Sequence, residues 1–159
     1  MSRYSIRKAR EQDCAEVARL ASQLGYPASD EAMRLRLRRL LASSSDVVFV
    51  AGTHGGLVGW IHAVLSQALE SDFRVEIAGL VVDERFLRKG VGRGLVERVE
   101  KWAIGRGVKQ TVVRCRTTRA GAHQFYESIG YSRAKMQIVF RKSLAQRPNT
   151  AQEQNATAL

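Results

Sequence analysis

Two adjoining stretches decide the fold of this chain: Val75-Glu76-Ile77-Ala78-Gly79-Leu80-Val81-Val82 and Leu87-Arg88-Lys89-Gly90-Val91-Gly92-Arg93-Gly94. The first is apolar at nearly every position, which is typical of a central strand buried on both faces. The second is basic and rich in glycine, and an amphipathic segment follows it with Leu95, Val99 and Trp102 on one face. The pattern therefore predicts a strand, a glycine loop and a helix. The unpaired N–H groups and the dipole of the first helical turn favour phosphate binding there.

The glycine spacing excludes two common phosphate-binding motifs. A dinucleotide-binding fingerprint needs a third glycine where Leu95 stands, and a Walker loop needs Gly-Lys-Ser/Thr after four intervening residues. A basic glycine turn before a helix also fits an ordinary capped connection, so the loop alone does not identify a ligand.

A second motif lies downstream, at Ala122-His123-Gln124-Phe125-Tyr126-Glu127-Ser128-Ile129-Gly130-Tyr131. It resembles Ala-x-x-Phe-Tyr-x-x-x-Gly-Phe/Tyr, and the glycine loop resembles Gln/Arg-x-x-Gly-x-Gly/Ala. These are two signatures of the GNAT superfamily of N-acetyltransferases, found here in the superfamily's order and at its distance. The resemblance covers roughly residues 75–142, and less specifically the whole chain from Tyr4. One position departs from the loop signature, because Leu87 stands where the superfamily has Gln or Arg.

Length and composition predict one domain without a membrane span. The chain has 159 residues, and we expect residues 1–145 to form a single domain. Residues 146–159 are rich in Gln, Asn, Thr and Ala without periodicity, which predicts a mobile polar tail. The absence of a long apolar run and of a secretory signal predicts a cytoplasmic protein. Cys14 and Cys115 stand far apart and outside any ligand pattern, so we expect neither disulfides nor a metal site.

The formal net charge of +11 is unusually high, and three explanations compete for it. They are nucleic-acid binding, anionic substrates, and solubility combined with steering of a polyanionic cofactor. The excess is densest in residues 34–39, 85–93 and 114–119. No nucleic-acid module surrounds these clusters, and only the middle one coincides with the predicted phosphate site, so nucleic-acid binding is disfavoured.

Hydrophobic periodicity predicts the remaining elements. We expect strands over residues 4–9, 46–51, 57–65, 75–82, 110–116 and 135–142, and helices over residues 11–24, 29–41, 91–103 and 120–129. Residues 67–73 are expected to be a polar connection. This order indicates a mixed α/β (α+β) fold: a twisted, mostly antiparallel central sheet flanked by about four helices. The resemblance further implies that strands 76–82 and 110–116 splay apart at one end, leaving a V-shaped cleft for acetyl-CoA.

The resemblance also implies the cofactor contacts. Backbone N–H groups of the glycine loop would hold the pyrophosphate, with added charge from Arg88, Lys89 and Arg93, although a solvated basic turn is the alternative. The strand before the loop would pair with the amide-rich pantetheine arm. Arg116 stands where the superfamily often has Asn. The implied cofactor-binding set is Leu80, Val81, Val82, Arg88, Lys89, Gly90, Val91, Gly92, Arg93, Gly94, Arg116 and Phe125.

Two residues are candidates for catalysis. An amine with a pKa of about 10.4 is almost fully protonated at pH 7, so a general base helps. Glu76 lies fourteen residues before Gly90, the spacing of the catalytic glutamate in histone acetyltransferases of the superfamily; a strand end paired with Arg74 is the alternative. Tyr126 would protonate the leaving thiolate or steady its charge, with a packed core aromatic as the alternative. The three histidines show no triad pattern and are expected to be structural.

The predicted function is acetyl transfer from acetyl-CoA to a primary amine of a small molecule or protein, by direct attack. The alternatives are a non-catalytic acyl-CoA-binding module, which Leu87 and Arg116 keep open, and a basic nucleic-acid binder. The arginines at positions 34, 36, 38 and 39 are expected to face solvent; if they line the acceptor site, the substrate should carry an acidic group. A homodimer fits the superfamily.

Overall fold

The computed structural model describes residues 4–145. These residues form five strands and four α-helices. In chain order, the elements are β1 (Ser5–Lys8), η1 (Glu11–Asp13), α1 (Cys14–Gln23), α2 (Asp30–Ala42), β2 (Asp46–Thr53), β3 (Gly56–Ala68), β4 (Ser71–Val82), η2 (Glu84–Phe86), α3 (Val91–Gly105), β5 (Thr111–Val113) and α4 (Ala120–Ser128). The predicted polar tail, residues 146–159, lies outside the described residues.

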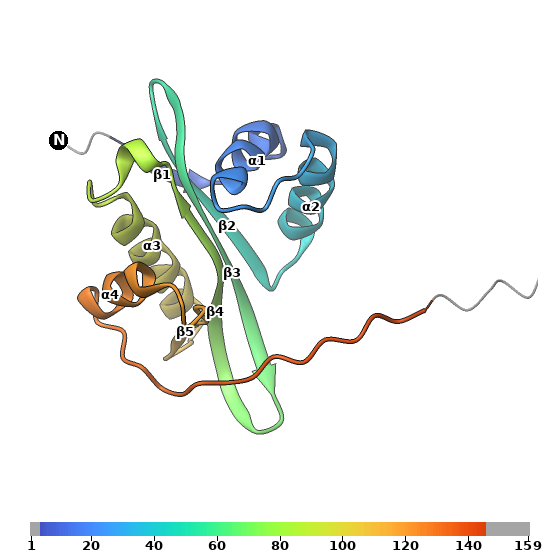
Figure 1. The fold of residues 1–159 in the computed structure, drawn as a ribbon, viewed down its shortest axis with the longest axis vertical. Coiled ribbons are helices and arrows are strands. Elements are labelled where there is room, and N and C mark those ends of the chain that lie inside the picture. Colours follow the sequence, from blue (N-terminus) through green and yellow to red (C-terminus); the bar gives the residue numbers. More distant parts are fainter. Residues whose placement is uncertain (1–3, 146–159) are drawn as a thin grey trace, which may run out of the picture.

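The strands form one sheet in the order β1-β2-β3-β4-β5. Neighbours from β1 to β4 are antiparallel, and β5 runs parallel to β4. Helices α1 and α2 lie on one face of the sheet, and α3 and α4 lie on the other (Figure 1). The predicted mixed α/β class, with four helices around a mostly antiparallel sheet, is confirmed.

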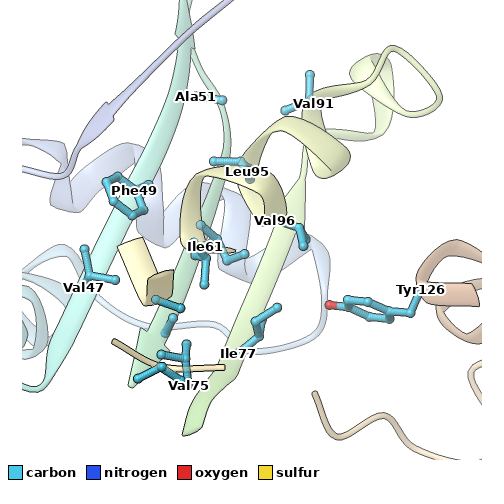
Figure 2. Packing of buried hydrophobic residues seen from close by; sticks show 14 of the residues in the cluster. Val47, Phe49, Ala51, Ile61, Val75, Ile77, Val91, Leu95, Val96 and Tyr126 are labelled. Carbon is cyan, nitrogen blue, oxygen red and sulfur yellow. The ribbon is translucent and has the colours of Figure 1, made fainter. Parts of the chain in front are cut away.

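Two hydrophobic clusters hold the layers together, one on each face of the sheet. The first joins Val75 and Ile77 of β4 to Leu95 and Val99 of α3, and Figure 2 shows this side. The second packs α1 and α2 against the opposite face, with Leu20 completely buried. Because both faces are covered, the central strands are apolar at consecutive positions, as the sequence indicated.

The parallel pair separates after a short contact. In the register of β4 and β5, Val75 lies opposite Thr111, Glu76 opposite Val112 and Ile77 opposite Val113. Strand β4 then continues through residues 78–82 without a partner in β5. The predicted splay between these two strands is confirmed, and it leaves one edge of β4 open to a ligand.

The predicted bounds of the strands over residues 57–65, 75–82 and 110–116 were wrong. The strand expected over 110–116 is paired only at Thr111–Val113, because the chain diverges from β4 there. The connection expected over 67–73 is mostly strand: β3 and β4 extend to Ala68 and from Ser71 in a long hairpin. Such a hairpin projects into solvent and tolerates polar residues on both faces.

The strand expected over residues 135–142 is also absent from the described part of the chain. The segment is extended but makes no ladder with the sheet. Met136, Ile138, Val139 and Phe140 are each more than 80% exposed. A strand-like sequence needs a neighbouring strand for its backbone groups, and this segment runs away from its own sheet (Figure 1).

Candidate active site

A large cleft opens where β4 and β5 separate. It has a volume of about 1490 Å³ and reaches from α2 on one face of the sheet to α4 on the other. Ligand sites commonly have about 300–1,000 Å³, so this cleft has room for a cofactor arm and an acceptor together.

The glycine loop forms the wall of the cleft at the start of α3. Gly90 is the N-cap of the helix, with a φ of 81° in the left-handed region that favours glycine. The Tyr4 hydroxyl donates to the Gly90 carbonyl at 2.9 Å, and the Gly94 N–H donates to the same oxygen at 2.9 Å. These bonds fix the loop so that the first N–H groups of α3 face outward, where an anion can bind them.

Two glycines of the loop are required by close packing. A Cβ atom at Gly92 would stand 3.2 Å from Cζ of Phe125, and one at Gly94 would stand 2.8 Å from the Tyr4 hydroxyl. Gly92 thus lets α3 approach α4, while Gly94 lets it approach the N-terminal strand region. The motif glycines therefore set the position of the helix as well as the exposure of its amides.

The structure places most of the predicted cofactor residues around the cleft, but not all of them. The residues that line it are Leu80, Val81, Val82, Arg88, Gly90, Gly92, Arg93, Arg116 and Phe125. The exceptions are Lys89, Val91 and Gly94. The Lys89 ammonium lies 4.8 Å from the centre of the Phe86 ring, and the Val91 side chain is buried in the core. These two residues can reach a ligand in the cleft by their backbone or by a change of side-chain conformation only.

Tyr126 borders the cleft from α4. Its ring makes edge contacts with Phe125 and Tyr131, with centroid separations of 5.0 and 5.4 Å. Figure 2 shows the hydroxyl pointing from α4 toward β4 and Ile77. Within residues 4–145, this hydroxyl has no hydrogen-bond partner. Burial raises the pKa of Tyr126 well above its ordinary value, so at neutral pH the group is an available proton donor.

Glu76 lies on the opposite face of the sheet from Tyr126 and does not line the cleft. Its neighbours Val75 and Ile77 pack beneath α3, so strand alternation directs the carboxylate toward the α1 and α2 side. The side chain is 18% exposed and forms an ion pair with Arg114. The alternative partner considered from the sequence, Arg74, is thus replaced by Arg114 just beyond β5.

His62 borders the cleft and is paired with Asp46 behind it, a pair that no sequence motif marks. The Nε2 atom of His62 on β3 lies 2.7 Å from Oδ1 of Asp46, and the Ser43 hydroxyl donates to the same carboxylate at 2.6 Å. His62 lines the cleft. The register of the β2–β3 hairpin brings the two side chains together. It places Asp46 opposite Val64, which lies two positions from His62 on the same face of β3.

The walls of the cleft are strongly basic. Among the described residues that line it there is no Asp or Glu, and the arginines are Arg36, Arg88, Arg93, Arg114, Arg116 and Arg119. A guanidinium nitrogen of Arg116 donates to the Tyr26 hydroxyl at 3.0 Å. Arg36 is exposed, as expected for the arginines of α2, and it also lines the cleft. Its neighbour Arg38 pairs instead with Glu11 at 2.6 Å, outside the cleft.

Comparison with known proteins identifies the family. The model of the acetyltransferase (GNAT) family matches residues 12–131. The chain belongs to the GNAT acetyltransferase family. The predicted superfamily is confirmed, and so is the enzyme class at the level of the family. No helix among residues 4–145 combines the length and the apolar character needed to cross a bilayer, and no cluster of three or more metal-ligand side chains occurs there.

Curated relatives of this GNAT chain match it over about half of its length. N-acetylaspartate synthetase of Rattus norvegicus is 34% identical over 83 residues, which are 52% of this chain and 27% of that protein. The protein of the same name from Danio rerio is 33% identical over 85 residues, 54% of this chain and 29% of that protein. The chain thus spans under a third of the length of these relatives.

Solved structures show the same fold over nearly the whole chain. An aminoglycoside N-acetyltransferase in complex with CoA has a TM-score of 0.81 at 20% identity, covering 91% of this chain and 97% of that one. The aminoglycoside antibiotic 6'-N-acetyltransferase of Acinetobacter baumannii has a TM-score of 0.79 at 17% identity, with coverages of 89% and 99%. Glucosamine-6-phosphate N-acetyltransferase of Arabidopsis thaliana has a TM-score of 0.75 at 21% identity, covering 88% of this chain and 99% of that one.

Proposed function

We propose that this GNAT-family chain transfers an acetyl group from acetyl-CoA to a primary amine by direct attack in a ternary complex. The observation that carries the proposal is the cleft between β4 and β5, which places an anion-binding helix start beside an unpaired strand edge. The amides at Gly90 and Gly92, with Arg88 and Arg93, would bind the pyrophosphate. Residues 80–82 would pair with the pantetheine arm as a neighbouring strand does.

Acetyl transfer needs a nucleophilic amine and a stabilised leaving group. The amine nitrogen attacks the thioester carbonyl, the C–S bond breaks, and the electron pair leaves on sulfur as the nitrogen loses a proton. Tyr126 would donate its hydroxyl proton in a hydrogen bond to that sulfur, since its buried phenol stays protonated. Glu76 would take the proton from the amine through a bridging water, with Arg114 orienting the carboxylate.

The acceptor does not follow from similarity. The relatives are named for aspartate, and the structural neighbours for aminoglycosides and glucosamine-6-phosphate, acceptors that differ in charge. We therefore leave the acceptor as a primary amine of a small molecule or protein at this stage. A cytoplasmic location belongs to the same proposal.

The test is binding of acetyl-CoA by calorimetry, together with thiol release across a panel of amines. Tyr126→Phe should lower kcat by about 100-fold while the Kd for acetyl-CoA stays within about twofold. Tyr131→Phe is the matched control, because it removes a phenol hydroxyl that bonds to Thr111 and Glu100 rather than facing the cleft.

Two results contradict the proposal. No binding of acetyl-CoA at millimolar concentration would remove its basis. Binding without turnover on any amine would instead indicate the non-catalytic acyl-CoA-binding module. Unchanged turnover in Tyr126→Phe would exclude the role given to that hydroxyl while leaving the enzyme class intact.

A further inference from the structure

The cleft has two chemically different halves. On the α3 and α4 side lie the glycine loop, Phe125 and Tyr126, the parts that would hold the cofactor. On the α1 and α2 side lie Arg36 from α2, His62 and Trp60 from β3, and Arg116 beyond β5. Tyr26, from the connection between α1 and α2, closes this second half through its bond with Arg116. We call the second half the acceptor half.

The acceptor half has positive charge without local compensation. The nearby carboxylates already have partners: Glu76 pairs with Arg114, and Asp46 pairs with His62. Among the described residues, neither Arg36 nor Arg116 forms an ion pair with a carboxylate. Within residues 4–145, the hydrogen bond of the Arg116 guanidinium is to the Tyr26 hydroxyl. Both guanidinium groups therefore retain donors that can bind an anion in a bidentate manner.

The indole of Trp60 adds a second observation. Its Nε1 donor is buried and has no hydrogen-bond partner within residues 4–145, although the ring borders the cleft. Buried donors without partners are uncommon in folded proteins. A bound oxyanion that displaces the ring slightly would satisfy this donor as well as the two guanidinium groups.

We infer that the acceptor is a small amine that carries a carboxylate or phosphate group, bound through Arg36 and Arg116. This inference rests on the proposed function. The anion would sit on the α2 side and leave the amine directed toward the thioester between the two strands. Arg36 and Arg116 are specificity-determining residues in this view, and the pyrophosphate is bound separately at the start of α3.

The experiment compares paired acceptors. One arm uses amino acids against the corresponding amino-acid amides, in which a neutral carboxamide replaces the carboxylate; the other uses amino-sugar phosphates against the free amino sugars. We expect kcat/KM to be at least tenfold higher for the anionic member of the preferred pair. Arg36→Gln should reduce that preference about tenfold by losing a charge-assisted contact. Arg39→Gln is the matched control, an exposed arginine of the same helix outside the cleft.

Binding without turnover separates this inference from the proposed function. Calorimetry of the CoA-loaded protein with a dicarboxylate that lacks the amine, and with inorganic phosphate, measures the anion site directly. Binding that Arg36→Gln or Arg116→Gln weakens supports the inference even if no amine is acetylated. The inference would be overturned if the enzyme preferred the neutral acceptors or accepted only cationic amines. It would also be overturned if Arg36→Gln lowered kcat/KM equally for both members of a pair.

Discussion

At the residue scale, the most constrained polar group is Asp83, which directly follows β4. Its side chain is 1% exposed and accepts hydrogen bonds from the Arg85 guanidinium and backbone and from Arg19. The Asp83 N–H donates to the Val58 carbonyl at 2.9 Å. This residue therefore ties the chain down where it leaves the open strand edge for the glycine loop. No sequence motif marks it, because its three partners come from separate parts of the chain.

Asp83→Asn should destabilise the fold in a pH-dependent way. Hydrogen bonds from Arg85, followed by those from Arg19, hold the pKa of Asp83 well below its ordinary value. A carboxyl group whose pKa is lower in the folded than in the unfolded protein stabilises the fold fully above its unfolded pKa of about 3.9. This contribution to the unfolding free energy is lost as the pH falls further. We expect Asp83→Asn to lower the unfolding free energy by about 1–2 kcal/mol at pH 7. The loss is this small because both guanidinium groups are solvent-exposed.

Urea unfolding of wild type and Asp83→Asn across a pH series measures this effect. The difference in unfolding free energy should be constant from pH 7 to about pH 5 and should shrink below about pH 4. A difference that persists unchanged at low pH would mean that packing, and not the charge, makes Asp83 important.

The identity of the general base is a second question at the residue scale. Glu76 has the family's spacing but does not line the cleft and is paired with Arg114, whereas His62 borders the cleft and is hydrogen-bonded to Asp46. If Glu76 is the base, Glu76→Gln should lower kcat/KM for the acceptor by about 100-fold near pH 7. His62→Gln should then cost less than tenfold. The pH–rate profiles of both variants measure these losses. If His62→Gln lowers kcat/KM more than Glu76→Gln does, His62 is the base instead.

At the element scale, the unit of β4, glycine loop and α3 could be predicted from sequence because its signals are local. An apolar run, a glycine at a left-handed position and a 3.6-residue period each act within a few neighbours. The end of β5 could not be predicted, because it depends on where two distant strands part. Residues 135–142 carry a strand pattern but pair with no strand of the described residues, since a sequence pattern does not specify the partner strand.

The same distinction explains the outcome for the candidate site. Most of the predicted cofactor residues belong to short motifs or to the strand beside them, and most of them border the cleft. Arg36 and His62 belong to no motif, and their place at the cleft depends on how α2 and the β2–β3 hairpin pack. Periodicity assigns Arg36 to the polar face of α2, but it cannot tell that the polar face ends at a cleft.

Gly94→Ala tests whether packing beneath the loop controls cofactor binding. The new Cβ would meet the Tyr4 hydroxyl and displace it from the Gly90 carbonyl. We expect a loss of stability of about 1 kcal/mol from that bond and a roughly tenfold weaker Kd for acetyl-CoA, because the helix start is no longer held. Thermal unfolding and calorimetry measure the two effects.

Gly105→Ala is the matched control at the other end of α3. A Cβ there meets nothing within 4 Å, so the higher helix propensity of alanine should raise stability by up to about 1 kcal/mol. Its Kd for acetyl-CoA should equal that of wild type. If Gly94→Ala also binds acetyl-CoA normally, the Tyr4 contact does not position the loop.

At the scale of the whole molecule, the net charge of +11 has a structural focus. Arginines from α2, the glycine loop, the segment after β5 and the start of α4 converge on one cleft that no Asp or Glu lines among the described residues. Low-dielectric walls concentrate the field of such a cleft and attract polyanions from a distance. We propose that this charge serves to attract a polyanionic cofactor and the anionic acceptor inferred above.

Salt dependence tests this explanation. At subsaturating acetyl-CoA, kcat/KM should fall about tenfold as added salt shortens the Debye length from about 10 Å at 0.1 M to about 3 Å at 1 M. Acetylated pantetheine, which lacks the phosphates of the coenzyme, should show little dependence on salt. Lys89→Gln, within the glycine loop, should flatten the salt dependence more than Lys109→Gln, which lies beyond the far end of α3. Equal slopes for both thioesters would show that the field of the cleft does not recruit the cofactor, and the charge would then have to act elsewhere on the surface.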